Sequence, residues 1–177
     1  MSRESGFGVS IERSAPVRLY PFTRYFRGFE DLPPVRALFG RSTKRVLAKL
    51  RVEFFSGRFG YMSTSDTDGH LLINTHHLKE AELRIVYLDL IHELCHVRQF
   101  LRGKPLFYPK LSYVDAPSEV EAYAHTVREG RRIGMTDAEL FDYLHMFWIL
   151  PEEHRRLARR VGVQVPQTPR SKRKAPK

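Results

Sequence analysis

At 177 residues, with 42% hydrophobic and 12% aromatic content, the chain has the length and composition of a single globular domain. No stretch approaches the roughly 18 apolar residues that a membrane helix requires, so we expect no membrane partner. The single cysteine excludes an internal disulfide, and the absence of a signal-peptide core near Met1 leads us to expect a cytoplasmic protein. A net charge of +10 suits acidic or nucleic-acid partners.

The first 31 residues combine glycine, serine, proline and scattered aromatic residues without a clear period, which predicts an irregular N-terminal arm over residues 1–31. Basic and aromatic residues are interleaved there: Arg13, Arg18, Tyr20, Phe22, Arg24, Tyr25, Phe26 and Arg27. Such an arm could bind nucleic acid through phosphate contacts and base stacking, or an acidic partner through charge. A basic surface without a specific partner is the simpler interpretation, and we prefer it.

The next segment predicts a small sheet. Residues 46–64 alternate between apolar and polar side chains in the manner of strands, with a turn signal at residues 56–57. A second turn at residues 66–69 precedes a short strand over residues 70–75. We expect this last strand at the edge of the sheet, where an extended peptide could add to it through main-chain hydrogen bonds.

A long segment over residues 79–101 has apolar residues at helical spacing, which predicts one buried helix, and it contains His92, Glu93 and His96 in an HExxH pattern. Two histidines four residues apart lie on one helix face, one turn apart, so both imidazoles can reach one Zn²⁺ ion. The carboxylate of Glu93 can accept a proton from a water molecule without binding the metal. A core helix with hydrogen-bonded histidines is the competing interpretation.

A catalytic zinc site takes three protein ligands and leaves the fourth position to solvent, so the sequence should supply one more ligand. The next predicted helix offers Glu119 and Glu121, which lie about 200° apart on a helix, so only one can face the metal. We predict that Ser118 and Glu121 form a capping box at the start of this helix. That leaves Glu119 as the preferred third ligand, with Glu121 and then His125 as alternatives.

These residues resemble a known family. HExxH followed about twenty residues later by Glu-x-x-Ala on the next helix resembles the gluzincin group of zinc metallopeptidases, most closely its ImmA/IrrE-type and HtpX-type branches. The same residues resemble uncharacterised bacterial domains of the HELxHVxQ…ExEA type. The resemblance covers roughly residues 68–130. It implies a zincin-like fold, with His92, His96 and Glu119 as zinc ligands and Glu93 as general base.

The C-terminal third predicts packing helices and a tail. Thr136 should cap a helix over residues 137–148, and a further helix is expected over residues 151–161. The basic, proline-containing residues 164–177 cannot form a core, and we predict a disordered basic tail. Residues 32–163 should then form one α+β domain, in which a small sheet with an edge strand packs on the HExxH helix.

The sequence thus predicts a zinc-dependent metalloendopeptidase that acts on protein or peptide substrates, with Glu93 as the catalytic base. A nucleic-acid-associated regulatory protein is the alternative, in which the zinc site is structural or conditionally active. A fourth ligand from Cys95 or His125 would indicate this alternative, whereas otherwise Cys95 is expected to be a small core residue. A metal-free scaffold with a basic tail that binds an acidic partner is the least favoured interpretation.

Hydrogen-bond donors for the oxyanion are expected among Tyr108, Tyr113, Tyr123, His76 and His125. His76 and its neighbour His77 follow the strand over residues 70–75 directly. We expect both histidines on the surface of the strand-to-helix turn, with a role in polarising a carbonyl group as the alternative.

Overall fold

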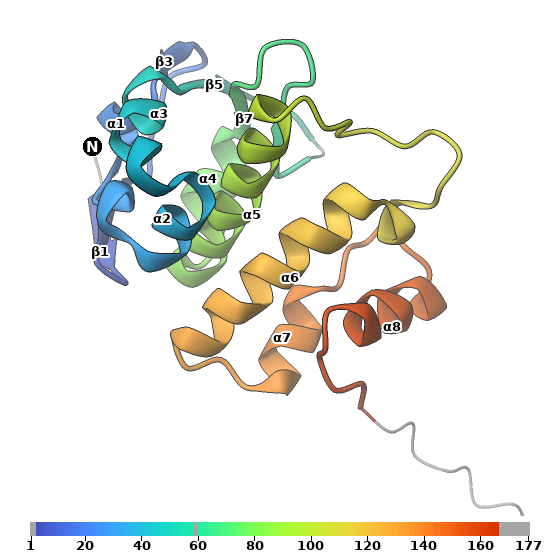
Figure 1. Ribbon diagram of the computed structural model, residues 1–177. Helices are drawn as coiled ribbons and strands as arrows, with labels where there is room; N and C mark the ends of the chain where they lie inside the picture. The colour runs from blue at the N-terminus through green and yellow to red at the C-terminus, as the bar shows by residue number, and fades with distance from the viewer. Residues whose placement is uncertain (1–2, 59, 167–177) are drawn as a thin grey trace, which may run out of the picture.

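The computed structural model describes residues 3–58 and 60–166, and within them the strands form two small sheets (Figure 1). The strands are β1 (Arg3–Gly6), β2 (Val9–Glu12), β3 (Leu19–Pro21), β4 (Phe26–Arg27), β5 (Arg51–Phe55), β6 (Met62–Thr64) and β7 (Leu71–Asn74). One sheet has the order β1-β2-β4 and is antiparallel. The other has the order β3-β5-β7-β6, in which only β5 and β7 run parallel.

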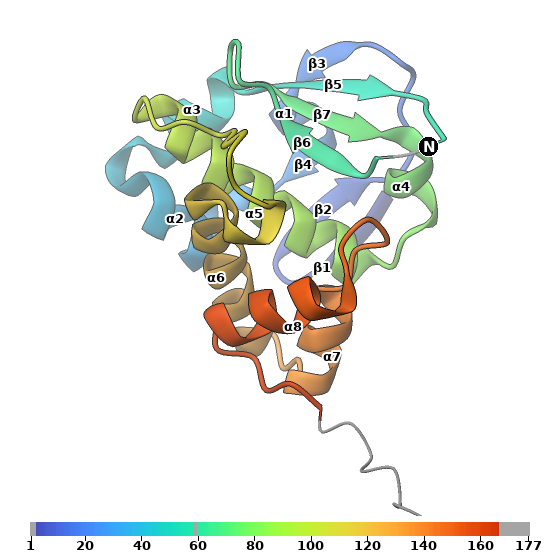
Figure 2. The ribbon, with the colours of Figure 1, turned by 90° about the vertical axis from the view of Figure 1, so that its right-hand side faces the viewer.

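The helices pack around and beside these sheets. They are α1 (Phe22–Tyr25), α2 (Pro33–Phe39), α3 (Thr43–Lys49), α4 (Thr75–Glu80), α5 (Leu83–Leu101), α6 (Pro117–Arg132), α7 (Asp137–Tyr143) and α8 (Pro151–Arg160), with short 3-10 turns at Phe29–Asp31, Gly40–Ser42 and Tyr113–Asp115. Figure 2 shows the four-stranded sheet at one end of the molecule, and α7 and α8 at the other. The chain therefore has an α+β fold, as the sequence predicts. None of the helices in the described residues is long and apolar enough to span a membrane.

Helix α5 lies at the centre of the fold. It packs against α6, α2 and β6, and its side chains from Val86 to Val97 are buried with the exception of Asp89. Each fully buried Leu, Ile or Val side chain there contributes about 1.5–3 kcal/mol relative to exposure. The predicted helix over residues 79–101 is interrupted, because Ala81 and Glu82 have extended backbone between α4 and α5.

The prediction of an irregular N-terminal arm is wrong. Residues 3–31 form β1 to β4 and α1, and Phe22, Phe26 and Phe29 are fully buried in the common core. The ring centroids of Phe22 lie 4.9 Å from Phe26 and 5.6 Å from Phe29. The strands in this segment are too short, and too closely separated by turns, to show the alternation of apolar and polar residues by which a strand is recognised in a sequence.

This burial also removes the predicted base-stacking surface. Phe22, Tyr25 and Phe26 are buried in the core and cannot stack on bases in solvent. Arg13 is buried as well, where its guanidinium donates to the Lys79 and Ala81 carbonyl oxygens and pairs with Glu4. Four of the eight interleaved residues are therefore buried in the fold, whereas Tyr20 is half-buried and the three other arginines are exposed.

Two further differences concern the segment around the four-stranded sheet. Residues 43–49 form helix α3 where the alternation predicts the start of a strand, because its apolar side chains also fit a short amphipathic helix. β7 lies inside the sheet between β5 and β6, so the expected edge position of residues 70–75 is wrong. β3 and β6 are the edge strands of this sheet, and β6 lies against α5.

The C-terminal elements agree with the sequence at their starts. Thr136 caps α7 in a capping box with Glu139, and Pro151 begins α8. α7 ends at Tyr143, five residues before the predicted end at residue 148. The predicted disordered tail lies outside the described residues from residue 167 on.

Candidate metal centre

Three side chains from two helices converge at one place: His92 and His96 on α5, and Glu119 in the first turn of α6. Pro117 at the first helical position begins α6 two residues before Glu119. Ala122, about one turn beyond Glu119, is fully buried, and its small side chain allows the two helices to approach closely. One ligand atom from each of the three residues lies within 4.8 Å of the others, and the group could hold a metal ion.

The spacing of these three atoms fits a metal site. His92 Nε2 lies 3.0 Å from His96 Nε2, and Glu119 Oε2 lies 3.3 Å from His92 Nε2 and 3.5 Å from His96 Nε2. Zinc–ligand bonds of about 2.0–2.1 Å in a tetrahedral arrangement place neighbouring ligand atoms about 3.3 Å apart. The observed triangle therefore has the dimensions of one face of a tetrahedral site.

Gln99 orients the ring of His96. Its side-chain nitrogen donates to the Ser118 carbonyl oxygen at 3.0 Å and to the Glu121 carboxylate at 2.9 Å. Its side-chain oxygen is left to accept a hydrogen bond from His96 Nδ1 at 2.8 Å. His96 Nδ1 then carries the proton, and the lone pair of the neutral imidazole is on Nε2, the atom that faces the cluster.

Glu121, the alternative third ligand, lies outside the cluster. Its carboxylate pairs with Arg98 and, at 3.3 Å, with Lys104, and it accepts the hydrogen bond from Gln99. The hydrogen bond from Gln99 and the charges of Arg98 and Lys104 lower the pKa of Glu121, although burial opposes this shift. Glu121 therefore holds the Gln99 amide, which in turn orients His96. Its effect on the cluster is indirect, through Gln99.

The capping box predicted between Ser118 and Glu121 is wrong. α6 begins at Pro117, so Ser118 is already inside the first turn. The Ser118 hydroxyl instead donates to the Leu106 carbonyl oxygen at 2.9 Å and fixes the preceding loop to the helix. Glu119 lies beside the histidines because it is on the side of α6 that faces α5. A capping box that occupies Glu121 is therefore not the reason why Glu119 is the carboxylate of the cluster.

The electrostatics of the cluster favour a bound cation. Burial opposes the charged form of His96, but the carboxylates of Glu119 and Glu93 outweigh it and raise the His96 pKa to about 9. Burial also opposes the charge on Glu119, yet the two histidines hold its pKa well below the ordinary value. Glu119 Oε2 and His92 Nδ1 are buried without an aligned hydrogen-bond partner among the described residues. A divalent cation would satisfy the buried oxygen together with the two Nε2 atoms beside it, whereas His92 Nδ1 is on the other side of its ring.

Glu93 lies beside the cluster and is held by Thr64. Thr64 is the last residue of β6, and its hydroxyl donates to Glu93 Oε2 at 2.7 Å. Burial raises the pKa of Glu93, although His96, His92 and Thr64 act in the opposite direction. A positioned carboxylate with a raised pKa is suited to accept a proton and to return it.

These side chains line a cleft of about 570 Å³. β6 lines one side, and residues of the α7–α8 connection line another; Figure 2 shows this connection extending toward β6 and α4. Tyr61 and Trp148, both partly exposed, contribute aromatic rings whose centroids are 5.9 Å apart. An apolar rim above a buried polar base suits a substrate with large apolar side chains.

Of the five expected oxyanion donors, Tyr113 and Tyr123 line the cleft. Their hydroxyl oxygens are 3.1 Å apart, and the Tyr123 ring lies 4.3 Å from the His92 ring between centroids. Burial raises the pKa of both tyrosines, so they keep their protons and remain donors. The others lie elsewhere: Tyr108 outside the cleft lining, His125 bonded to the Pro34 carbonyl, and His76 exposed beside Ser56.

Sequence reasoning missed Thr64 and the hydrogen-bonding role of Gln99, and also a cluster around Asp89 in the cleft wall. Asp89 accepts hydrogen bonds from His77 Nε2 at 2.7 Å and from the Tyr143 hydroxyl at 2.9 Å. His77 is therefore not the surface residue that was expected, since its side chain is 10% exposed. Asp89 lies four residues before Glu93 on α5, and that helical spacing is a signal that could have placed it in the cleft.

Comparison with models of known protein families, with curated protein sequences and with solved structures gives no match for this chain. The chemistry of the site is therefore inferred from its geometry. Among the described residues, the group that could hold a metal ion has three members. Cys95 is buried with its sulfur near Arg98 and Gln99, and neither it nor His125 belongs to the group.

Proposed function

We propose that this protein is a zinc-dependent metalloendopeptidase of the gluzincin type, with a zincin-like arrangement of edge strand, HExxH helix and Glu-bearing helix. One observation carries the proposal: His92, His96 and Glu119 meet at ligand distances at the base of a cleft, with the Glu93 carboxylate beside them. A three-residue group leaves a coordination position for solvent, as a catalytic zinc site requires. This favours catalysis over a closed structural site.

The ligand set supports zinc as the metal. Two imidazole nitrogens and one carboxylate oxygen are ligands that Zn²⁺ commonly takes in proteins. Mg²⁺ and Ca²⁺ prefer sites whose ligands are all oxygen atoms, so this set of ligands suits Zn²⁺ better. When bound, the ion would act as a Lewis acid that polarises the scissile carbonyl and lowers the pKa of a water molecule. Gln99 would keep His96 in the tautomer that such an ion needs.

The protein's own groups account for the proton transfers. Glu93 would take the proton of the attacking water and pass it to the leaving amine, while Thr64 holds its carboxylate in place. Tyr113 would donate a hydrogen bond to the oxyanion of the tetrahedral intermediate, because the Tyr123 hydroxyl beside it already donates to Met146 Sδ at 3.1 Å. Both residues line the cleft, and their hydroxyls keep their protons across the physiological pH range.

The edge strand supports an extended peptide as the substrate. Asn74 N–H donates to the Tyr61 carbonyl and Ser65 N–H to the His70 carbonyl, so these pairs fix the side of β6 that faces β7. Alternation in an antiparallel ladder turns the backbone groups of Met62 and Thr64 to the other side. Over residues 3–58 and 60–166 these groups form no backbone hydrogen bond to another element, so a substrate backbone could pair with them along the cleft that β6 lines.

Metal content tests the first part of the proposal. Purified protein should contain about one equivalent of zinc, and His96→Ala should lose it because one of three ligands is removed. In an excess of zinc about a thousand times its dissociation constant, binding would add about 4 kcal/mol to the free energy of unfolding. That corresponds to a rise in melting temperature of about 8–16 °C for a chain of this size. Wild-type protein that has been stripped of metal with a chelator, and whose melting temperature then does not respond to added zinc, would refute the metal site.

Cleavage tests the second part. An unfolded protein substrate should be cut by the wild-type protein, and Glu93→Gln should abolish cleavage while the zinc content stays at one equivalent. Glu152→Gln, an exposed change on α8 far from the cleft lining, is the matched control and should retain full activity. Equal activity in Glu93→Gln and wild type would exclude the proposed base.

A further inference from the structure

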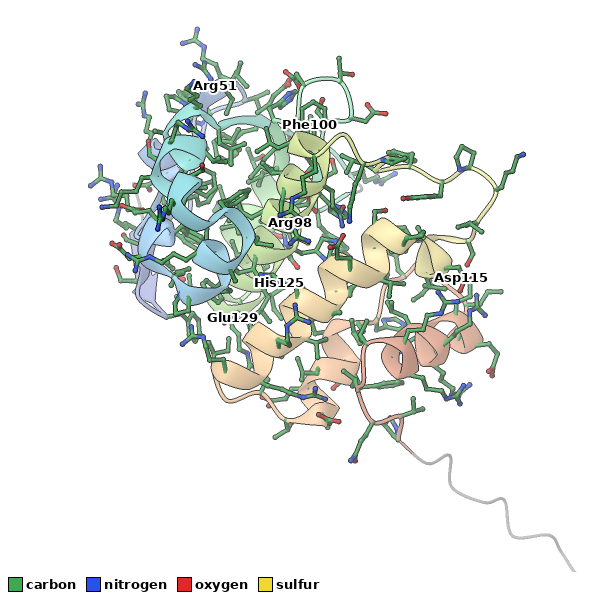
Figure 3. The ribbon with its side chains drawn as sticks, in the orientation of Figure 1. Arg51, Arg98, Phe100, Asp115, His125 and Glu129 are labelled. Atoms are coloured by element: carbon green, nitrogen blue, oxygen red, sulfur yellow. The ribbon has the colours of Figure 1, made fainter. Side chains whose placement is uncertain are left out.

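A second cavity, of about 640 Å³, lies between α3, the start of β5, the β6–β7 turn and the C-terminal part of α5. Its lining shares no residue with the lining of the metal cleft. Five cationic side chains belong to it: Arg45, Lys49, Arg51, Arg98 and Arg102. In Figure 3, Arg51 and Phe100 lie toward the same end of the molecule, with Arg98 below Phe100 on α5.

The positive charge of this cavity is only partly balanced. Asp68 is the acidic residue in its lining, and its carboxylate already accepts hydrogen bonds from Ser65 and His70. Arg98 is paired with Glu121. Over residues 3–58 and 60–166, Lys49, Arg51 and Arg102 form no ion pair, and Arg45 contacts the neutral hydroxyl of Ser42.

The base of the cavity is apolar. Leu50 and Val97 are buried there, and the half-buried ring of Phe100 covers Gly69 so closely that a Cβ atom at that glycine would lie 2.4 Å from the ring. A concave apolar base with unpaired cations at its rim binds a ligand that combines negative charge with a flat or apolar part. Arginine guanidinium groups match the oxygens of phosphate in particular.

We propose that this cavity binds a phosphate-bearing ligand, with Lys49, Arg51 and Arg102 on the phosphate and the Phe100 side of the cavity against a base or another planar group. A free nucleotide and the backbone of single-stranded nucleic acid share this chemistry. The site is independent of the proposed zinc chemistry, because no residue of the cluster or its cleft takes part.

Binding of ATP and of a short single-stranded oligothymidylate to the full chain tests the proposal, measured by fluorescence anisotropy and calorimetry. The double variant Lys49→Gln/Arg102→Gln should weaken binding of the recognised probe at least tenfold. Lys44→Gln is the matched control, since Lys44 is exposed on α3, the helix of Lys49, but outside the cavity lining, and it should change the affinity less than threefold. Circular dichroism should show that both variants are folded.

The two probes separate the sources of phosphate. ATP that binds and displaces the oligothymidylate would identify a nucleotide site. Oligothymidylate binding that ATP does not displace would identify nucleic acid, and about three phosphate contacts would then lower its affinity about twentyfold between about 50 and 200 mM salt. Absence of binding to both probes would overturn the proposal. So would binding that the double variant leaves unchanged, because the basic C-terminal residues would then account for it.

Discussion

The hydrogen bond from His96 to Gln99 predicts that a residue outside the metal cluster controls metal affinity. In Gln99→Met the side chain keeps its length but loses both the acceptor for His96 Nδ1 and the donor to Glu121. His96 must keep its Nδ1 proton when Nε2 binds the metal, so a buried N–H group would be left unsatisfied in the metal-bound state. Loss of such an orienting partner typically weakens metal binding 10- to 100-fold, or by about 1.4–2.7 kcal/mol.

The assay is a competition titration with a chromophoric zinc chelator at about pH 7.5. Glu121→Gln should have a smaller effect than Gln99→Met, because the Ser118 carbonyl still holds the Gln99 amide. Thr126→Val removes a buried hydroxyl of α6 that bonds to the Ala122 carbonyl, and it serves as the control for general damage to this helix. A folded Gln99→Met variant that binds zinc within threefold of wild type would refute the orienting role.

Three further changes test other contacts. Thr64→Val should lower peptide cleavage about 10- to 100-fold with zinc content unchanged, since it removes the donor that holds Glu93, and concurrent loss of zinc would contradict this interpretation. Burial, together with the neighbouring Arg128, holds the pKa of His125 below the ordinary value. The unfolded chain therefore takes up this proton first, and stability is lost as the pH falls below about 6.5. The melting temperature of His125→Gln should therefore fall less between about pH 7.5 and 5.5 than that of wild type, and parallel curves would exclude the effect. Gly28→Ala should lower the free energy of unfolding by at least about 2 kcal/mol in a denaturant titration, because φ is +86° and the new Cβ would lie 2.7 Å from the Gly8 carbonyl oxygen. Gly134→Ala, also at positive φ but in open space, should cost only about 1 kcal/mol, and equal losses would refute the steric part.

The elements of the site that follow from local geometry could be predicted from the sequence. A helix fixes the relation between His92, Glu93 and His96 at one turn, whatever surrounds it. The same reasoning placed Glu119 and Glu121 on different sides of α6, and only Glu119 lies beside the histidines. The α+β class followed in the same way from strand and helix periodicities.

The contacts made across the sequence could not be predicted in this way. Thr64 reaches Glu93 because β6 pairs with β7 at the sheet edge, and strand order depends on the whole topology. The N-terminal strands are two to four residues long, too short for a period of two to be recognised against turn residues. β1 and β3 are largely exposed, whereas β2 and Phe26 of β4 are buried with the aromatic side chains of α1 and the following turn, in a core that the sequence shows only in part.

The burial of the site itself argues for a metal. His92, Glu93, His96 and Glu119 are four titratable groups in contact at the base of one cleft, and their charges are costly to bury unless they are paired. Protons can balance the carboxylates, but protonated imidazoles 3.0 Å apart would repel each other. A cation at the centre removes this conflict, because it pairs with Glu119 and leaves both histidines neutral. In the proposed reaction, Glu93, held aside by Thr64, would then be the group left to exchange protons with a substrate.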